Sequence, residues 1–450
     1  MKRIAATKLN VVLIGAAVTL SALLCWYLWQ QSRGGFGILS IIPMTPPHGY
    51  TDSVAISPNG ARVAFMGQAF SDGSGSFFVE VRNVASGQQV SKLTIPLATA
   101  EQNKMGYSMS PKLSFCDSGK YLVAFAPLDR LYVADTRTSA LRDPIHFYDL
   151  RIPAEGADPN PSDSPVPEGP VQFDCAASDG VAVLGFSDSV GTAAIKLIDL
   201  ESGKELADLA GVIQGLISKS LSQRYESDGL AISPDGSKVA VVVWQWGQNE
   251  GPTVDLLDTQ RRQLIRTLHL GDGFRIEHRL TFAGEGALVI GEPECQPNGK
   301  CDPRSLPRGR TLRVWDFAGS GAVTKFAPSG TETYRSVGAS ANGDVVFAYT
   351  GDESYCSSCS SRNGELKIHN ARFTVWDRAS GKVVARSPKL RVETHSCPWL
   401  TLGACESYQQ VPEMQMSANG KSILAFWPQR DFPPPEKIKG LGDLEVFNLQ

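Results

Sequence analysis

The cysteines are the residues of this 450-residue chain whose spacing most directly suggests chemistry. Cys356 and Cys359 are separated by two serines, which is the spacing of thiol–disulfide exchange sites. Those sites lie at a helix N-terminus, which lowers the thiol pKa, whereas this pair lies in a polar stretch at 352–363. We therefore interpret the pair as a structural disulfide and keep thiol exchange as an alternative.

Apart from Cys25, the cysteines are even in number and most fall in close pairs, as is typical of an oxidising compartment. The predicted disulfides are Cys356–Cys359, Cys295–Cys301, Cys397–Cys405 and Cys116–Cys175. The two cysteines of the last pair would bridge neighbouring repeats, or they could be buried thiols. The four cysteines of the first and third pairs could also hold zinc by ligand count, although their spacing is wide.

Other catalytic patterns are absent from the sequence. None of the six histidines shares a metal-binding spacing, and the chain has no nucleophile elbow, phosphate loop or calcium loop. We expect no metal and no cofactor. The sequence thus leans against an enzyme without deciding the question.

Aromatic and charged residues recur at one point of a repeated unit, just before its first strand. The candidate ligand-binding residues are Tyr50, Tyr107, Arg224, Tyr225, Glu226, Arg275, Glu277, His278, Tyr334, Arg335 and Tyr408. Such a mixture could hold an anionic or sugar-like ligand by charge-assisted bonds and stacking. The alternative is that the tyrosines pack between the repeats and the charges pair with one another.

The repeated unit itself is a tight turn followed by strand-forming runs. Residues 233–236 read Ser-Pro-Asp-Gly, in which Pro presets one turn dihedral and Gly supplies a positive one. Related turns end at Gly60, Gly119, Gly180, Gly236, Gly286, Gly343 and Gly420. Third strands are predicted at 79–84, 131–136, 195–200, 254–259, 312–317, 373–378 and 444–449.

Seven such units predict an all-β fold, a seven-bladed β-propeller of four-stranded antiparallel blades. The chain stops after the third strand of the seventh unit, so residues 38–42 are expected to complete that blade and close the ring. Val314-Trp315-Asp316 and Val375-Trp376-Asp377, together with the turns, resemble the tryptophan–aspartate (WD) repeat propellers. The Gly-His pair of that family is missing here.

Long insertions separate the strands, and all fall between second and third strands or between blades. They are 97–110, 153–170, 210–228, 294–310, 351–371, 389–411 and 428–442. Because successive turns of a meander alternate between the two sides of the disc, these insertions should share one face, together with the mouth of the central channel. Three of the predicted disulfides would brace them. Loops on a rigid scaffold commonly carry binding, so this face is the candidate binding face.

The N-terminal segment predicts a membrane anchor. Leu9 to Trp29 contains no charged residue, follows three basic residues and ends in aromatic residues, and about 20 apolar residues span a bilayer. A cleaved signal peptide is the alternative, but no small-residue cleavage site follows. We expect a cytoplasmic tip at 1–8, one transmembrane signal anchor at 9–29, a linker at 30–37 and the propeller at 38–450, in the periplasm or outside the cell.

These features predict a membrane-tethered, exported propeller that binds a protein or another ligand on its insertion-rich face. The net charge of -3, without long blocks of like charge, argues against a nucleic-acid partner. The alternative is a propeller enzyme of lactonase, glycan-cleaving or quinone-dependent type at the channel mouth. Glu226, Glu277, His278 and Arg335 would then be the residues to substitute.

Overall fold

The structure is a computed structural model. It describes residues 21, 36–42, 51–71, 74–96, 112–126, 130–146, 172–187, 193–217, 229–243, 253–270, 280–292, 311–319, 321–326, 332–356, 365–388, 390, 413–426 and 444–449. No helix among these residues has the length and apolarity to span a membrane. The predicted anchor at 9–29 lies outside them, apart from Ser21.

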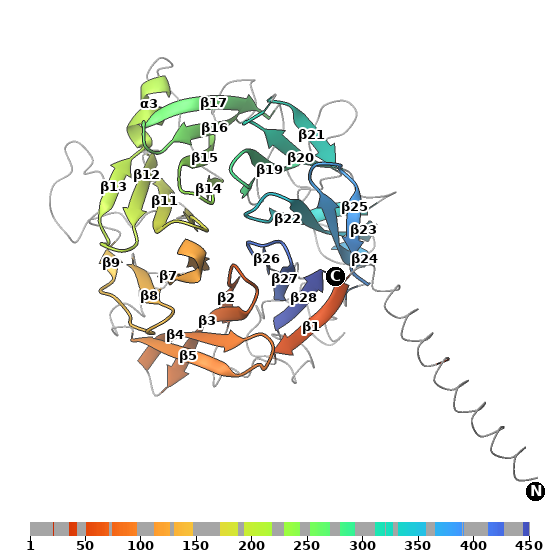
Figure 1. Ribbon diagram of the computed structural model, residues 1–450, viewed down its shortest axis with the longest axis horizontal. Coiled ribbons are helices and arrows are strands. Elements are labelled where there is room, and N and C mark those ends of the chain that lie inside the picture. The colour runs from red at the N-terminus through yellow and green to blue at the C-terminus, as the bar shows by residue number, and fades with distance from the viewer. Residues whose placement is uncertain are drawn as a thin grey trace, which may run out of the picture.

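Seven four-stranded antiparallel sheets stand around a central axis, each running from the axis to the rim (Figure 1). Blades 1 to 3 are β2 (Thr51–Ile56), β3 (Arg62–Ser71), β4 (Ser74–Asn83), β5 (Gln89–Pro96); β6 (Lys112–Cys116), β7 (Tyr121–Ala126), β8 (Arg130–Asp135), β9 (Ile145–His146); and β10 (Gln172–Cys175), β11 (Val181–Ser187), β12 (Ala193–Asp199), β13 (Glu205–Asp208). Blades 4 to 6 are β14 (Leu230–Ile232), β15 (Lys238–Val243), β16 (Thr253–Asp258), β17 (Gln263–His269); β18 (Thr281–Ala283), β19 (Ala287–Glu292), β20 (Thr311–Asp316), β21 (Val323–Phe326); and β22 (Glu332–Ala339), β23 (Val345–Cys356), β24 (Glu365–Asp377), β25 (Val383–Arg386). The expected seven-bladed, all-β propeller is confirmed.

Blade 7 joins the two ends of the propeller. Its strands are β26 (Glu413–Met416), β27 (Ser422–Phe426), β28 (Leu444–Leu449) and β1 (Phe36–Ile42). β1 is the outermost strand and pairs antiparallel with β28, from Phe36 opposite Leu449 to Ile42 opposite Leu444. Residues 38–42 were predicted to complete this blade and close the ring. The observed strand begins slightly earlier, at Phe36, inside the expected linker.

The blades are held together by seven hydrophobic clusters, one at each seam between neighbours. β15 shows why its sequence is an unbroken apolar run. Val239, Val241 and Val243 pack toward blade 3, while Ala240 and Val242 pack toward blade 5. Successive side chains of a strand point to opposite faces, and both faces of a propeller blade are covered.

The described turns between first and second strands and between third and fourth strands are short. We call the side of the disc that carries them the turn face. The second-to-third connections and the links between blades leave from the opposite side, here called the long-loop face, because successive turns of a meander alternate.

Two of the expected insertions contain regular structure. In 351–371, β23 continues to Cys356 and β24 already starts at Glu365, so the blade 6 hairpin projects well beyond the disc on the long-loop face. In 210–228, α3 (Ala210–Ile217) forms directly after β13. The expectation of plain loops was wrong at these two places. The other five insertions lie outside the described residues, apart from Leu390.

Candidate functional site: the hub and the two faces

The turns between the first two strands of blades 1, 4, 6 and 7 are stabilised by their own side chains. In blade 4, Ser233 Oγ donates to Asp235 Oδ1 at 2.6 Å and accepts the Lys238 N–H at 2.9 Å. In blade 7, Ser417 and Asn419 make the same pair at 2.7 Å. The Ser-x-Asp/Asn-Gly sequence is therefore a structural turn signal, since Ser and Asx side chains compete well for turn backbone.

These turns are also bonded to one another around the axis. The Ser118 N–H donates to Ala177 O at 2.6 Å, and the Ser178 N–H donates to Pro234 O at 2.8 Å. Asn342 and Asn419 donate in the same way to Ala418 O and Pro58 O, both at 3.2 Å. Much of the polar backbone at the centre of the turn face is thus used within the molecule.

The aspartates of the WD motifs cap the turns between third and fourth strands. Asp377 Oδ1 accepts the Ser380 N–H at 2.7 Å, and the Ser380 hydroxyl and backbone N–H both lower the pKa of Asp377. Trp376 is buried in the seam between blades 5 and 6. Trp315 is buried between blades 4 and 5. The motif residues build blades and do not form a reactive site.

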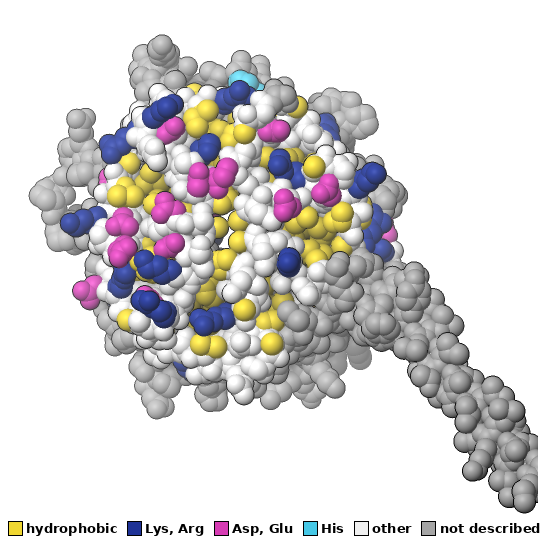
Figure 2. All heavy atoms as spheres, in the orientation of Figure 1, with side chains coloured by type: hydrophobic (Ala, Val, Ile, Leu, Met, Phe, Trp, Pro, Cys, Tyr) yellow, Lys and Arg dark blue, Asp and Glu magenta, His cyan; other side chains and the backbone are white. Residues whose placement is uncertain are grey.

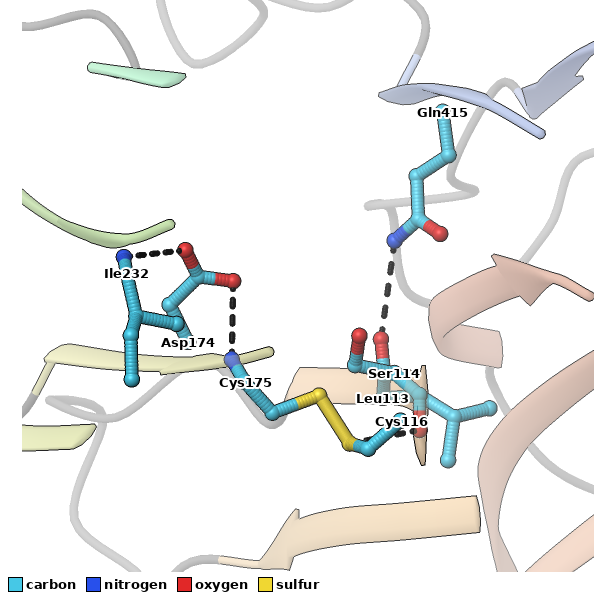
Figure 3. Close-up of a disulfide and its surroundings, with 7 residues drawn as sticks. All are labelled: Leu113, Ser114, Cys116, Asp174, Cys175, Ile232 and Gln415. Carbon is cyan, nitrogen blue, oxygen red and sulfur yellow. Dashed lines mark hydrogen bonds between the residues drawn. A yellow bond between two sulfur atoms is a disulfide. The ribbon is translucent and has the colours of Figure 1, made fainter. Parts of the chain in front are cut away.

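Polar side chains around the hub, meaning the innermost strands, link one blade to the next (Figure 3). Gln415 Nε2 donates to Val54 O at 2.9 Å and to Leu113 O at 3.5 Å, so blade 7 is bonded to blades 1 and 2. Asp174 Oδ2 accepts the Ile232 N–H of the neighbouring blade at 3.0 Å. In the described part of the hub, these groups hold the ring closed.

A disulfide between Cys116 and Cys175 joins the innermost strands of blades 2 and 3 (Figure 3). The two Cα atoms are 5.7 Å apart and both residues are buried. This is the pairing that was predicted from the cysteines left over. Of the other predicted disulfides, only the backbone of Cys356 is described, at the end of β23; the partners Cys295, Cys301, Cys359, Cys397 and Cys405 lie outside the described residues.

Of the residues expected at the channel mouth, only Tyr334 and Arg335 lie in a described element, β22. Tyr334 is only 1% exposed and packs with Val337 and Trp376 in the seam between blades 5 and 6. The expectation that it lines the channel mouth was wrong. It lies beside an irregularity of the β22–β23 pairing and follows the alternative of packing between blades.

The remaining candidates lie outside the described residues, so their arrangement stays a prediction. They are Tyr50, Tyr107, Arg224, Tyr225, Glu226, Arg275, Glu277, His278 and Tyr408. Within the described ranges, no three His, Cys, Asp or Glu side chains are placed to hold a metal ion.

One pair of carboxyl groups on the turn face has unusual electrostatics, and no pattern in the sequence predicts it. Burial and the adjacent Asp235 carboxylate raise the pKa of Glu285 to about 7. Burial alone would raise the pKa of Asp235, but hydrogen bonds from Glu285, Ser233 and Ser237 outweigh it and lower that pKa. The pair therefore shares a proton across the seam between blades 4 and 5.

Comparison with known proteins supports the architecture. No family profile and no curated protein matches the chain. Among solved structures, the chain is similar to the β-propeller domain of Cps50 (Swd1) from Myceliophteria thermophila, with a TM-score of 0.52 and 13% identity over 92% of this chain and 100% of that one. Fold and motifs together define a WD-repeat-like seven-bladed propeller. At this identity the likeness concerns the fold alone.

Proposed function

We propose that this protein is an exported, membrane-tethered β-propeller that binds a protein partner through its long-loop face. The observation that carries the proposal is the asymmetry of the disc. The turns at the centre of the turn face bond to one another, whereas the long insertions of the sequence all attach on the other side. Loops on a rigid scaffold are the usual place for recognition.

The long-loop face has rigid supports for such loops. β3 and β4 pair as far as Ser71 and Ser74, and β23 and β24 pair as far as Cys356 and Glu365. These two extended hairpins belong to blades 1 and 6, which flank blade 7 on either side (Figure 1). A partner would thus meet projecting β-structure next to the blade that closes the ring.

Two features support export and tethering. The uncharged run from Leu9 to Trp29 leads within a few residues into β1, so the rim of blade 7 would lie close to the membrane. The Cys116–Cys175 disulfide suits an oxidising compartment.

Site-specific photo-cross-linking of the full chain in its own membranes tests the binding face. A photoreactive residue would replace Asn160 or Leu400 in the insertions, or Ser86 or Ala379 on the turn face as matched controls. We expect a discrete protein adduct from the insertion positions and none from the controls. Adducts only from the turn face, or none anywhere, would rule out this face as the binding site.

The same membranes test the tether. Alkaline extraction should leave the wild-type chain in the pellet, whereas V18K/L20K should release it, because a central lysine costs about 2.5–3.5 kcal/mol on insertion. A wild-type chain that is extracted as readily as the variant would exclude the anchor while leaving the cross-linking result valid.

A further inference from the structure

Within the described residues, β17 on the rim of blade 4 pairs with no strand on its outer side. β17 is the outermost strand of its sheet and has seven residues, whereas the outer strands of blades 2, 3, 5 and 6 have two or four. An unpaired edge strand presents a row of N–H and C=O groups that another strand can bond, and short edges or charges normally limit this. β1 and β5 are the other long outer strands; β1 adjoins the predicted anchor and β5 ends at Pro96.

The charged residues of β17 and of the turn before it are of one sign: Arg261 and Arg262 lie in the turn, and Arg266 lies in the strand. Arg261, Arg262 and Arg266 fall within six positions, His269 ends the strand, and all four are exposed. Within the described structure neither Arg261 nor Arg266 forms an ion pair, and Arg262 donates through Nη2 to Leu206 O of blade 3 at 3.0 Å. Figure 2 shows Lys and Arg side chains along this part of the rim.

Blade 3 contains a positive charge that is neutralised within the fold. Lys196 is buried and paired with Asp208 at 2.7 Å and with Glu205 at 3.3 Å. Arg261 and Arg266 have no such carboxylate partner among the described residues. Beside them, Ile265 is 40% exposed and Leu206 on the adjoining rim is 48% exposed. A basic edge with exposed aliphatic side chains is complementary to an extended chain that alternates acidic and apolar residues.

We propose that β17 is a docking edge for an extended acidic segment of a partner protein, which adds to blade 4 as a fifth strand. Main-chain hydrogen bonds would supply most of the affinity, and arginine–carboxylate contacts would select the acidic segment. The edge lies three blades from β1 and on the rim (Figure 1), so it is separate from both the tether and the long-loop face. The inference goes beyond the proposed function and does not depend on it.

Fluorescence anisotropy with the full chain in detergent tests the proposal directly. The probe is a labelled heptapeptide of sequence Glu-Val-Glu-Thr-Glu-Val-Glu, with two control peptides. One has Lys in place of every Glu, and the other keeps the charges but has every interior amide N-methylated. We expect saturable binding of the first peptide only, since the second has the wrong charge and the third cannot donate main-chain hydrogen bonds.

Substitutions then locate the site. R261E/R266E should weaken binding at least tenfold, while K382E/K421E, which makes the same change of charge at exposed lysines on other blades, should leave it within twofold. If R261E/R266E does not fold, R261Q/R266Q should still weaken binding measurably. Equal binding of the N-methylated peptide, an equal loss in K382E/K421E, or no saturable binding would overturn the proposal in favour of general attraction to anions or of no site.

Discussion

Glu285 and Asp235 show how two turn residues from neighbouring blades can couple stability to pH. The folded-state pKa of Glu285 is about 7, above its ordinary value of 4.5, so the pair holds a proton that the unfolded chain gives up. An acid whose pKa is raised by folding stabilises the fold fully at pH values below its unfolded-state pKa. That stabilisation is lost as the pH rises through its folded-state pKa. The lowered pKa of Asp235 acts in the opposite sense and only in strongly acidic solution.

We therefore expect the melting temperature of the wild-type protein to fall between about pH 5 and about pH 8 more steeply than that of E285Q, whose amide keeps a donor for Asp235 without titrating. Because both side chains are only partly buried and solvent screens the pair, the difference should stay below about 1 kcal/mol. E201Q removes an exposed carboxylate elsewhere and serves as the control. An identical pH slope in the wild type and E285Q would exclude the shared proton.

Gly343 is needed where the turns of blades 5 and 6 meet. Its φ is +78°, and a Cβ there would lie 2.8 Å from Ala283 O. Gly87 has a similar φ of +68° but no atom within 4 Å, so it isolates the backbone cost. We expect G87A to lose about 1–2 kcal/mol in urea unfolding, and G343A to lose about 1–3 kcal/mol more from the clash. Equal losses would show that the turns can separate without cost.

At the scale of elements, the Cys116–Cys175 disulfide joins the inner strands β6 and β10. Each of these short strands pairs with only one neighbour, β7 or β11. The disulfide closes a loop with a sequence separation of 59, for which the chain-entropy contribution is about 4 kcal/mol. We expect C116S/C175S to lose about 2–4 kcal/mol in urea unfolding. Reductant should lower the free energy of unfolding of the wild-type protein to that of the variant and leave the value for the variant unchanged. A variant as stable as the oxidised wild type would mean that the hub bonds of Asp174 and Gln415 suffice.

The elements that the sequence predicted are those with a local signal. The turn at Gly236 and the strands after it follow from Pro, Gly and apolar runs, and five of the seven predicted third strands start and end within two residues of the observed ones; β4 starts earlier, at Ser74. β24 also starts earlier, because the polar residues around Gly351 hide the continued pairing with β23. Contacts that depend on closure, such as Gln415 to Val54, join residues far apart in sequence and have no local pattern.

On the scale of the whole molecule, the propeller depends on a strand from its own N-terminal side. Without β1, blade 7 would have three strands, and β28 would present a free edge next to the seam that packs blade 7 against blade 1. An open edge of this kind invites pairing with other chains. Blade closure should therefore govern both the stability and the solubility of the ring.

Three chains without the anchor test this. A chain that starts at Phe36 should fold, whereas one that starts at 43 should lose on the order of 3–5 kcal/mol, from the hydrogen bonds of a seven-residue strand, and should aggregate. Because Phe36 pairs with Leu449, a tight Asn-Gly turn after residue 450 could lead directly into residues 36–42. Moving residues 36–42 to the C-terminal end of the chain that starts at 43 should restore the stability of the chain that starts at Phe36. If the chain that starts at 43 is as stable as the chain that starts at Phe36, closure by β1 does not hold the ring together. The same follows if the chain with residues 36–42 moved to its C-terminal end stays unstable.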